Sequence, residues 1–589
     1  MRCLGSNVDP DYAKFLPPRI AEGIEKAASN LAPARIGWAV VQDREHTHNR
    51  RWIFRPDKVG ADPFGQRTVR ANMHPGYQNP DAIGPSGPVD PDLSVISVQS
   101  PNGRPIALLA NYSMHYFGSP ILSADYYGRF VAGIAKSIRA DANAPAFVGI
   151  MSQKTSGDLM WMDYGKPRRD ITLDDYSDGV VQYAYEAHKR IDHRDWAPLV
   201  MRESRLTLGF RVPNEETLAW ARKIMASLNG RLPQSQAEIY AREQIYLHER
   251  PIAELKLQAL RIGELGIAAI PNEVFAITGL KIKAQSPLRT TFNIELANGA
   301  EGYIPPPEQH KLGGYTTWPA RTAGLEPQAE PRIVETILKL LEEVAGQPRR
   351  KVTETLNAYA KTVLASKPVA YWRFGEFSGP TALDSSGNNN HGRYEDGVAF
   401  YVEGLREGST TINRCAHFAG GRMVASVKNL GPAYSVEMWF WNGLPSDVRP
   451  VTGVLFSRGT DGPKSGASER LGIGGPSEWG RLTFTSDREL SRTMVIGRTN
   501  EIPFKAWNHV VFVRDGNAIR VHLNGTGAPE VSTTSELPFH MNADTVVIGG
   551  PGQNVNTFEG KIDEVAIYDR ALSLEEIESH FRASPLPPN

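Results

Sequence analysis

The feature of this sequence that most restricts its fold is a series of short strand signals in its second half, each bounded by turn residues. Apolar and polar residues alternate in short runs at 434–441, 453–457, 481–485, 507–513, 518–523, 545–548 and 562–568. Asp515-Gly516-Asn517 fits a hairpin turn between two of them. Strands at this spacing are typical of an antiparallel sandwich, so we expect an all-β domain here.

The first half alternates strands with helices. Apolar runs at 34–42, 93–99, 104–110 and 146–151 predict strands, and we expect the last two to be buried. Helical patterns cover 11–31, 128–140 and 175–191. This order favours an α/β sandwich with a mixed sheet. Because 589 residues are too many for one core, we expect a multidomain protein, with domains at 1–345 and 367–583 and a linker at 346–366.

Composition excludes several classes of protein. The 65 basic residues balance the 65 acidic ones, and no basic patch suggests a nucleic-acid partner. Nothing reaches the length of a membrane span. The two cysteines, Cys3 and Cys415, are too far apart to indicate a disulfide framework or a cysteine-built zinc site. The first residues contain no apolar signal-peptide core, so we expect no export signal in the chain as given.

A polar segment with one histidine follows the strand at 104–110. His115 lies where the predicted strand passes into a loop, a common place for a metal ligand or a base. Asp125 can orient it or cap the next helix. The alternative, with equal weight, is a hydrogen-bonded core histidine beside an N-cap aspartate. His46 and His48, two apart on an extended segment, can bind metal together, but a solvated turn is favoured there.

Three further segments carry candidate side chains. Ser156, in a glycine-containing loop after a strand, is a candidate nucleophile, although a turn role is commoner. Glu273 follows a strand and starts a helix, which suits a hard metal ligand or an acidic helix start. Tyr303 and Tyr315 lie in loops stiffened by proline or glycine, where a phenol can ligate zinc or simply pack. Arg50 can hold an anionic or carbonyl oxygen.

Residues 1–345 resemble the catalytic domain of the neutral, non-lysosomal ceramidases, which are zinc-dependent amidases. Asn111-Tyr-Ser-Met-His115 resembles the segment with the second histidine ligand, and Pro271-Asn-Glu273 resembles the Pro-Gly-Glu segment with the glutamate ligand. Gly302-Tyr303-Ile-Pro-Pro-Pro resembles the segment with the tyrosine ligand. Tyr315 keeps the place of a second active-site tyrosine, and Arg50 that of an arginine near the substrate carbonyl. The resemblance thus implies His115, Glu273 and Tyr303 as zinc ligands.

The sequence departs from that family at two places. The first histidine ligand of the family precedes the helix expected at 11–31, and no such histidine stands there. We therefore expect that the natural chain begins upstream of Met1, with a signal peptide and the histidine. The family loop Gly-Asp-Val-Ser-Pro reads Gly157-Asp158-Leu-Met160-Trp here, so Asp158 is retained as a catalytic candidate while Met160 replaces the serine. His46 or His48 filling the empty ligand position is a minority interpretation.

Residues 367–583 resemble the laminin-G-like, concanavalin A-like jelly roll. The resemblance rests on segments such as 370–374, 383–392, 507–510, 523–525 and 560–568. Such domains commonly bind glycans or proteins, often with calcium, so calcium is a candidate cofactor. Asp384, Asn388 and Asp563 are oxygen donors, but turn and strand-end roles are favoured for each.

Together these resemblances imply a zinc-dependent hydrolase of amide bonds, acting on an N-acyl lipid or related substrate, with a carbohydrate- or protein-binding module. The full-length form is expected to be secreted, periplasmic or at the cell surface. The alternative is a non-catalytic adhesion or glycan-binding protein that keeps a degenerate ceramidase fold. Met160 and the absent first histidine favour this alternative, whereas Arg50, Glu273 and Tyr303 favour the enzyme.

Overall fold

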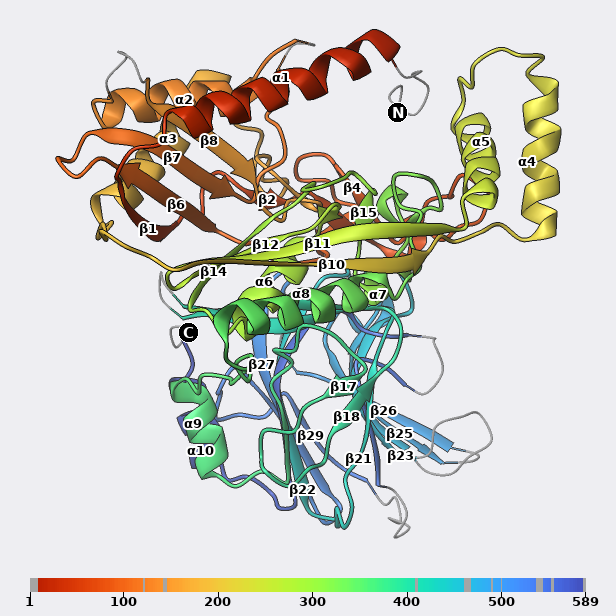
Figure 1. Cartoon of the computed structure of the whole chain (residues 1–589). Helices are drawn as coiled ribbons and strands as arrows, with labels where there is room; N and C mark the ends of the chain where they lie inside the picture. The colour runs from red at the N-terminus through yellow and green to blue at the C-terminus, as the bar shows by residue number, and fades with distance from the viewer. Residues whose placement is uncertain are drawn as a thin grey trace.

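The protein has an α/β first half and an all-β second half that lie against each other (Figure 1). The computed structural model describes residues 9–119, 122–140, 146–407, 411–459, 468–488, 491–498, 501–535, 544–551 and 556–585. Cys3 lies outside the described residues, and Cys415 is a buried free cysteine. Within the described residues, no helix is both long enough and apolar enough to cross a membrane.

The first half is layered as helices, sheet, sheet, helices. Its first sheet has the order β1-β6-β7-β8, antiparallel except for the parallel pair β7–β8. One face packs on α2 and α3, and the other on the second sheet through side chains such as Ile96, Ile267 and Phe292. The elements are β1 (Arg35–Gln42), β6 (Asp92–Gln99), β7 (Pro105–Tyr112), β8 (Val148–Gln153), α2 (Asp125–Ser137) and α3 (Leu173–Lys189).

The second sheet has the order β10-β11-β12-β14 and is also mixed, because only β12 and β14 run parallel. The apolar face of α8, with Ile333, Ile337 and Leu341, covers its outer side. These layers confirm the expected α/β sandwich. The elements are β10 (Leu199–Gly209), β11 (Ile252–Ile262), β12 (Leu265–Ala269), β14 (Thr290–Ile294), α6 (Ala276–Gln285) and α8 (Ala329–Ala345).

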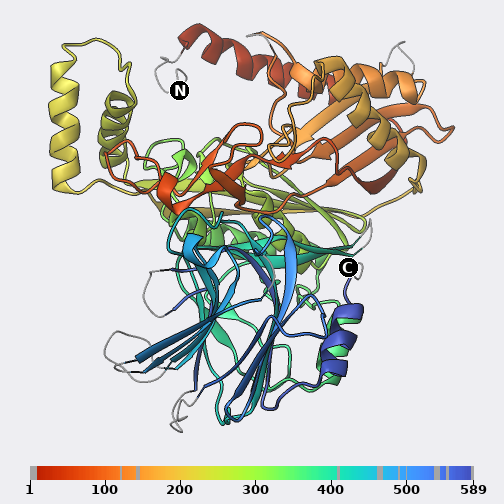
Figure 2. The same cartoon turned by 180° about the vertical axis from the view of Figure 1, so that it is seen from behind.

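Short strands connect the layers and carry most of the candidate site. β2 (His48–Asn49) pairs with β9 (Leu159–Met160), and β13 (Glu273–Val274) pairs with β15 (Tyr303–Ile304). β3 (Arg51–Phe54) lies between β4 (Ala71–Met73) and β5 (Ala82–Pro85). The hairpin of α4 (Glu215–Ser227) and α5 (Gln236–Glu249) projects from one side, as Figure 2 shows. The remaining pieces are η2 (Pro56–Lys58), α7 (Pro307–His310) and η3 (Tyr315–Thr317).

Two predicted elements differ from expectation. The strand at 146–151 is β8, an edge strand, so Val148 and Ile150 are 53% and 48% exposed rather than buried. The helix expected at 11–31 is α1 (Pro10–Ser29), and none of its residues is buried. Apolar spacing along the chain identified both elements, but it does not reveal whether a neighbour covers the apolar face.

The second half is a two-sheet sandwich with α9 and α10 on one outer face. One sheet comprises β19-β20-β31-β22-β27-β28-β29, with β16 on β31, and the other comprises β17-β18-β21-β30-β23-β24-β25-β26. Large apolar side chains such as Phe400, Phe418, Val436 and Phe512 form the core. This sandwich confirms the expected all-β domain.

The elements of this half begin after α8. They are α9 (Ala358–Ala365), β16 (Ala370–Trp372), β17 (Thr381–Ala382), β18 (Gly392–Tyr394), β19 (Val398–Glu407), β20 (Thr411–Ala419), β21 (Met423–Ser426), β22 (Tyr434–Asn442), β23 (Val451–Gly459), β24 (Ser468–Gly474), η4 (Pro476–Glu478), β25 (Leu482–Arg488), β26 (Ser491–Ile496), β27 (Trp507–Asp515), β28 (Ala518–Leu523), β29 (Val531–Thr534), β30 (Thr545–Ile548), β31 (Glu559–Tyr568) and α10 (Leu574–Arg582).

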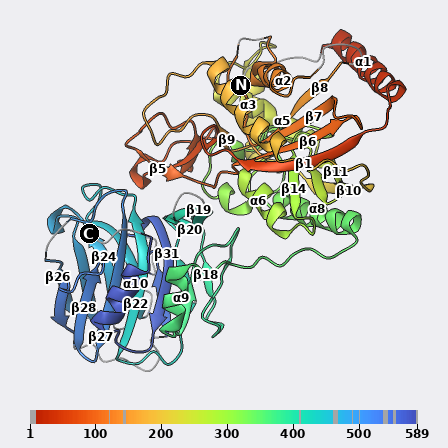
Figure 3. The same cartoon turned by 90° about the vertical axis from the view of Figure 1, so that its left-hand side faces the viewer.

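The two halves share a packed interface and a connecting segment between α8 and α9, visible in Figure 3. Ile53, Ile83 and Leu312 of the first half form one apolar cluster with Ala399 and Ala419 of the second. Arg70 forms a buried ion pair with Glu559, and Lys505 Nζ donates to the Ala82 carbonyl at 3.0 Å. Polar and apolar contacts therefore fix the sandwich against the α/β half.

Candidate functional site

Glu273 and Tyr303 are brought together by backbone pairing. β13 and β15 run parallel with these two residues in register. Gly302 adopts a φ of 74°, which suits glycine, and a Cβ there would lie 2.4 Å from the Thr322 carbonyl oxygen. The Tyr303 amide donates to that same oxygen at 2.7 Å. The close approach of Gly302 to Thr322 and the pairing of β13 with β15 therefore set the tyrosine beside the carboxylate.

Arg50 is the central cation of the site. It is 3% exposed, and its Nη2 lies 3.2 Å from Tyr303 Oη and 3.0 Å from the Gly157 carbonyl oxygen. Tyr315 Oη lies 3.4 Å from Tyr303 Oη, with the two rings edge to face. Burial lowers the pKa of Arg50, but Tyr315, Tyr303 and Glu273 raise it more, so the net shift is upward. The guanidinium is thus held charged among phenols and a carboxylate.

Two histidines lie within electrostatic reach of this cation. Burial, Arg50 and His74 lower the pKa of His115 to about 3, so its imidazole is neutral at ordinary pH. Burial and Arg50 lower the pKa of His74 to about 4. Tyr164 Oη lies 2.6 Å from His74 Nδ1, and Gln153 Nε2 lies 3.4 Å from His115 Nδ1. The site therefore contains two neutral imidazoles, one of which was not predicted.

The site is closed at its base and open at its rim. Arg50 and Tyr303 are buried, Glu273, His115 and Tyr315 are half-buried, and His74 is exposed. Burial raises the pKa of Glu273, and this effect outweighs the hydrogen bond from Tyr303 and the charge of Arg50, which both lower it. Burial also raises the pKa of the Tyr303 phenol well above its usual value. Exposure to solvent therefore decreases from His74 through Glu273 and His115 to Arg50, so the carboxylate and the imidazole are more accessible than the cation.

Asp158, a predicted catalytic residue, has both carboxylate oxygens occupied by structural contacts. Oδ1 accepts from the Ala276 amide, at the start of α6, and Oδ2 accepts from Asn49 Nδ2, each at 2.8 Å. Burial raises its pKa to about 6. Asp158 connects β2, β9 and α6, so it supports the site's backbone, while its neighbour Gly157 contacts Arg50.

Ser156 does not present a free hydroxyl. Its Oγ donates to Glu295 Oε1 at 2.6 Å and accepts from Gln153 Nε2 at 2.9 Å, and the residue is fully buried. Glu295 also accepts from the Val274 amide, beside Glu273. Burial raises the pKa of Glu295 to about 8. The contacts favour the turn role of Ser156 over the role of nucleophile.

His46, His48 and Asp125 have other partners. His46 is a core residue whose Nδ1 lies 2.9 Å from the fully buried Asp43 carboxylate. His48 Nε2 lies 3.1 Å from the Glu45 carbonyl oxygen, so the structure does not join the two histidines in one site. The Asp125 carboxylate accepts from the amides of Phe117, Gly118 and Ser119. It therefore fixes the loop after His115.

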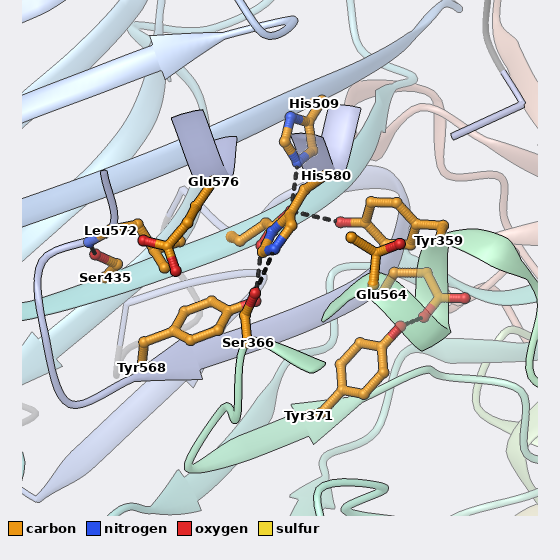
Figure 4. Close-up of polar contacts among 12 residues, drawn as sticks. Tyr359, Ser366, Tyr371, Ser435, His509, Glu564, Tyr568, Leu572, Glu576 and His580 are labelled. Carbon is orange, nitrogen blue, oxygen red and sulfur yellow. Dashed lines mark hydrogen bonds and ion pairs between the residues drawn. The ribbon is translucent and has the colours of Figure 1, made fainter. Parts of the chain in front are cut away.

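A second polar cluster lies between one sheet of the sandwich and the helices α9 and α10. Tyr359, His509, Tyr568 and His580 converge there, as Figure 4 shows. All four contact the carboxylate of Glu437, at 2.8, 2.8, 3.0 and 2.8 Å. Glu437 is fully buried, so we interpret the cluster as structural: it binds α9 and α10 to β22, β27 and β31.

The calcium candidates of the sandwich lie apart. Asp384 accepts from the amides of Tyr371, Ser386 and Asn390, which is a turn role. Asn388 donates to main-chain carbonyls. Asp563 is fully buried, and its Oδ2 accepts from Asn413 Nδ2. The contacts of Asp384 agree with a turn role, and no pair of these residues shares a contact among the described hydrogen bonds.

A metal site built from three acidic, histidine or cysteine side chains is absent from the described residues. The predicted zinc ligands are a different kind of set, because one of the three, Tyr303, is a phenol. As a donor set they suit zinc: a neutral imidazole nitrogen, a carboxylate oxygen and a phenol oxygen. Tyr303 contacts Glu273, and the charge of Arg50 acts on the pKa of both Glu273 and His115.

Residues 420–578 match the family model of the concanavalin A-like lectin/glucanases superfamily. No curated protein matches the chain. This match covers the strands β21 to β31 and the first part of α10, and the strands β16 to β20 of the sandwich lie before it.

Three solved structures show distant likenesses. Neutral ceramidase from Pseudomonas aeruginosa is 15% identical, with a TM-score of 0.37, over 87% of this chain and 79% of that chain. Domain 4 of AbnA, an extracellular arabinanase from Geobacillus stearothermophilus, is 23% identical, with a TM-score of 0.27, over 36% and 98%. The botulinum neurotoxin serotype D binding domain is 17% identical, with a TM-score of 0.28, over 37% and 51%. At TM-scores this low, these likenesses support no conclusion about function.

Two members of the site were missed from the sequence. His74 lies in the segment 56–91, which offered no strand or helix to place it, although its position before Pro75 was visible. Glu295, at the end of an apolar strand, is a buried acid that contacts Ser156 and β13. A charged residue that ends an apolar strand was the available signal for Glu295.

Proposed function

We propose that the α/β half is a zinc-dependent hydrolase of amide bonds, with an N-acyl lipid or a related amide as substrate. The observation that supports this best is that Tyr303 contacts both the buried Arg50 and Glu273, while the charge of Arg50 also acts on the pKa of His115. His115, Glu273 and Tyr303 would hold the metal. When bound, zinc supplies a Lewis acid that polarises an amide carbonyl and acidifies a water molecule.

The chain's own residues supply the remaining parts of a hydrolytic site. Arg50 and Tyr315 offer N–H and O–H donors to the negative charge that develops on the amide oxygen. The partial exposure of Glu273 and His115 admits the substrate, and His74 lies at the rim, where it can accept or donate a proton. We further propose that the sandwich is a glycan- or protein-binding module and that the full-length protein is exported.

A second function has its own support. Met160 is 5% exposed where the ceramidase-like loop has a serine, and the nearby Ser156 is bonded to Glu295. A non-catalytic glycan-binding protein would tolerate both features.

An activity assay separates the two functions. The purified protein, supplied with zinc, is expected to hydrolyse a fluorogenic N-acyl amide, and His115→Ala is expected to abolish turnover. His193→Ala is the matched control, because that half-buried histidine bonds Ser97 elsewhere. No turnover by the folded wild-type protein on short- or long-chain N-acyl amides would favour the non-catalytic function.

A further inference from the structure

A groove of about 630 Å³ runs between the connecting segment 350–357 and the edge of the sandwich. The segment forms one wall, and residues at the start of the sandwich and on β19 and β20 form the other. Figure 3 shows this segment crossing from α8 to α9. Because the groove lies outside the site around Arg50, a ligand there would not compete with the proposed amide substrate.

The sandwich wall carries a stacked aromatic pair. The rings of Phe377 and Tyr401 lie with centroids 4.0 Å apart and planes 25° apart, and both side chains are only half-buried. The Arg414 guanidinium lies 4.8 Å from the centroid of the Tyr401 ring. Tyr401 has a φ of 58°, a strained conformation for a bulky residue. A flat, rigid, partly exposed aromatic surface is thus maintained in a concave place, as in small-ligand sites.

The groove is rich in positive charge. Arg350, Lys351, Arg373 and Arg414 line it, and Glu354 is the one acidic residue among the lining residues described. Arg373 is neutralised by Glu564 and Glu354. Lys351 is exposed on the segment wall, opposite the strand that carries Arg414. Carboxylate and sulfate groups are the ligands that such side chains bind most strongly.

A neighbouring groove extends the same chemistry. It has a volume of about 280 Å³ and shares Arg414 as a lining residue. Trp52 adds an aromatic ring and Arg44 adds a positive charge, while Lys166 is paired with Asp163 and Glu403 is negative. Two adjoining grooves with aromatic and cationic linings offer consecutive positions to a chain-like ligand.

We propose that these grooves bind an acidic oligosaccharide, with a sugar ring packed against the Phe377–Tyr401 pair and its acidic group near Lys351 and Arg414. This inference rests on the proposed role of the sandwich as a glycan-binding module. It adds where the glycan binds and that the glycan is negatively charged. A neutral glycan would use the aromatic pair but offer no negative charge to Lys351 and Arg414. A protein ligand would not need a groove whose sandwich wall carries an aromatic pair.

Calorimetric titration tests this with three tetrasaccharides: an oligogalacturonate, a chondroitin sulfate fragment and neutral cellotetraose. We expect the acidic sugars to bind the full chain more tightly than cellotetraose, and to bind more weakly as salt is raised. Phe377→Ala should weaken binding roughly tenfold or more, which corresponds to loss of about 1.4 kcal/mol. Lys351→Ala, an exposed change that leaves packing intact, should weaken only the acidic sugars, by roughly threefold or more. The carboxylate and sulfate arms show which group is preferred.

Trp479→Ala is the matched control, because Trp479 is an aromatic residue of the sandwich that is 62% exposed and does not line either groove. Acidic-sugar binding that both groove variants leave unchanged would overturn the grooves as the site, while the module would remain a glycan binder. Equal affinity for cellotetraose would overturn the acidic class. No binding of any of the three sugars would contradict this proposal, whereas amide hydrolysis by the same sample would show that the proposed enzyme stands.

Discussion

Arg50 donates a hydrogen bond to Tyr303, with Nη2 3.2 Å from the phenol oxygen, across 253 positions of sequence. This contact joins the segment after β2 to β15 and places a buried positive charge beside the Glu273 carboxylate. The pair thus connects the arginine proposed to stabilise the oxyanion with the tyrosine proposed to bind zinc. Its removal therefore gives the first prediction.

Arg50→Lys should reduce kcat/KM for an N-acyl amide by about 10²-fold or more, since one oxyanion donor is typically worth this much. Lysine keeps the charge but loses the planar donors that reach both Tyr303 and the Gly157 carbonyl. The measurement is steady-state kinetics with thermal unfolding as a check on the fold. An unchanged kcat in a folded variant would remove Arg50 from the catalytic site.

Ser156→Ala should keep amide hydrolysis within about threefold of wild type, because the hydroxyl is buried and bonded to Glu295 rather than free. The same change should cost about 1–3 kcal/mol of stability, since it leaves Glu295 with an unmet acceptor or proton. Kinetics and urea unfolding measure the two effects. Loss of more than a hundredfold in kcat, at unchanged stability, would instead make Ser156 a nucleophile.

Arg70→Ala should destabilise the protein by about 3–5 kcal/mol, because it leaves Glu559, 2% exposed, as a buried charge without its partner in the other half of the chain. Lys311→Ala is the control: its ion pair with Asp396 also joins the halves, but both side chains are mostly exposed. Calorimetry should show a large drop in Tm for the first and little change for the second. Equal small effects would contradict a fixed interface.

The Glu437 cluster predicts a pH optimum of stability. Burial disfavours the charged form of His580, but Glu437 outweighs this and raises the pKa of His580 above its usual 6.5. That stabilisation is complete below about pH 6.5 and is lost as pH rises through the raised pKa. The pKa of Glu437 is depressed below its usual 4.5 by His580 and His509, despite burial, so its contribution is lost as the solution becomes strongly acidic.

His580→Asn should therefore flatten the fall in unfolding free energy above about pH 6.5, measured by urea titration at a series of pH values. The variant should also be less stable than wild type at pH 5.5. His522→Asn serves as control, because His522 is on the same sandwich but contacts a main-chain carbonyl instead of Glu437. An identical slope in wild type and His580→Asn would mean that His580 does not carry this dependence.

Periodicity and turn residues were enough to predict the elements that bury apolar surface. The alternating runs at 434–441 and 507–513 became the paired strands β22 and β27, and the helical pattern at 175–191 became α3. Each of these signals is local, because the spacing of apolar residues within one segment shows that the segment has an apolar face, whichever neighbour packs on it. The edge position of β8 was not predictable, because edge and centre depend on pairing between distant segments.

The candidate site divides in the same way. His115 and Glu273 were visible as polar residues after strands, and Tyr303 as a phenol in a stiffened loop. Their use as one ligand set came from the resemblance, and the pairing of β13 with β15 brings Glu273 and Tyr303 together. His74 and Glu295 were missed because neither has a local pattern: the first stands in an irregular segment and the second depends on burial for its raised pKa. Burial is a property of the whole fold.

The most direct measurement is the zinc content of the purified full chain by mass spectrometry after exhaustive dialysis, for wild type, His115→Ala, Glu273→Gln and the control His193→Ala. The account predicts about one zinc per wild-type and control molecule, and a marked loss in the other two. Zinc absent from the wild type after loading, or retained equally in all four, would contradict a site built from His115, Glu273 and Tyr303.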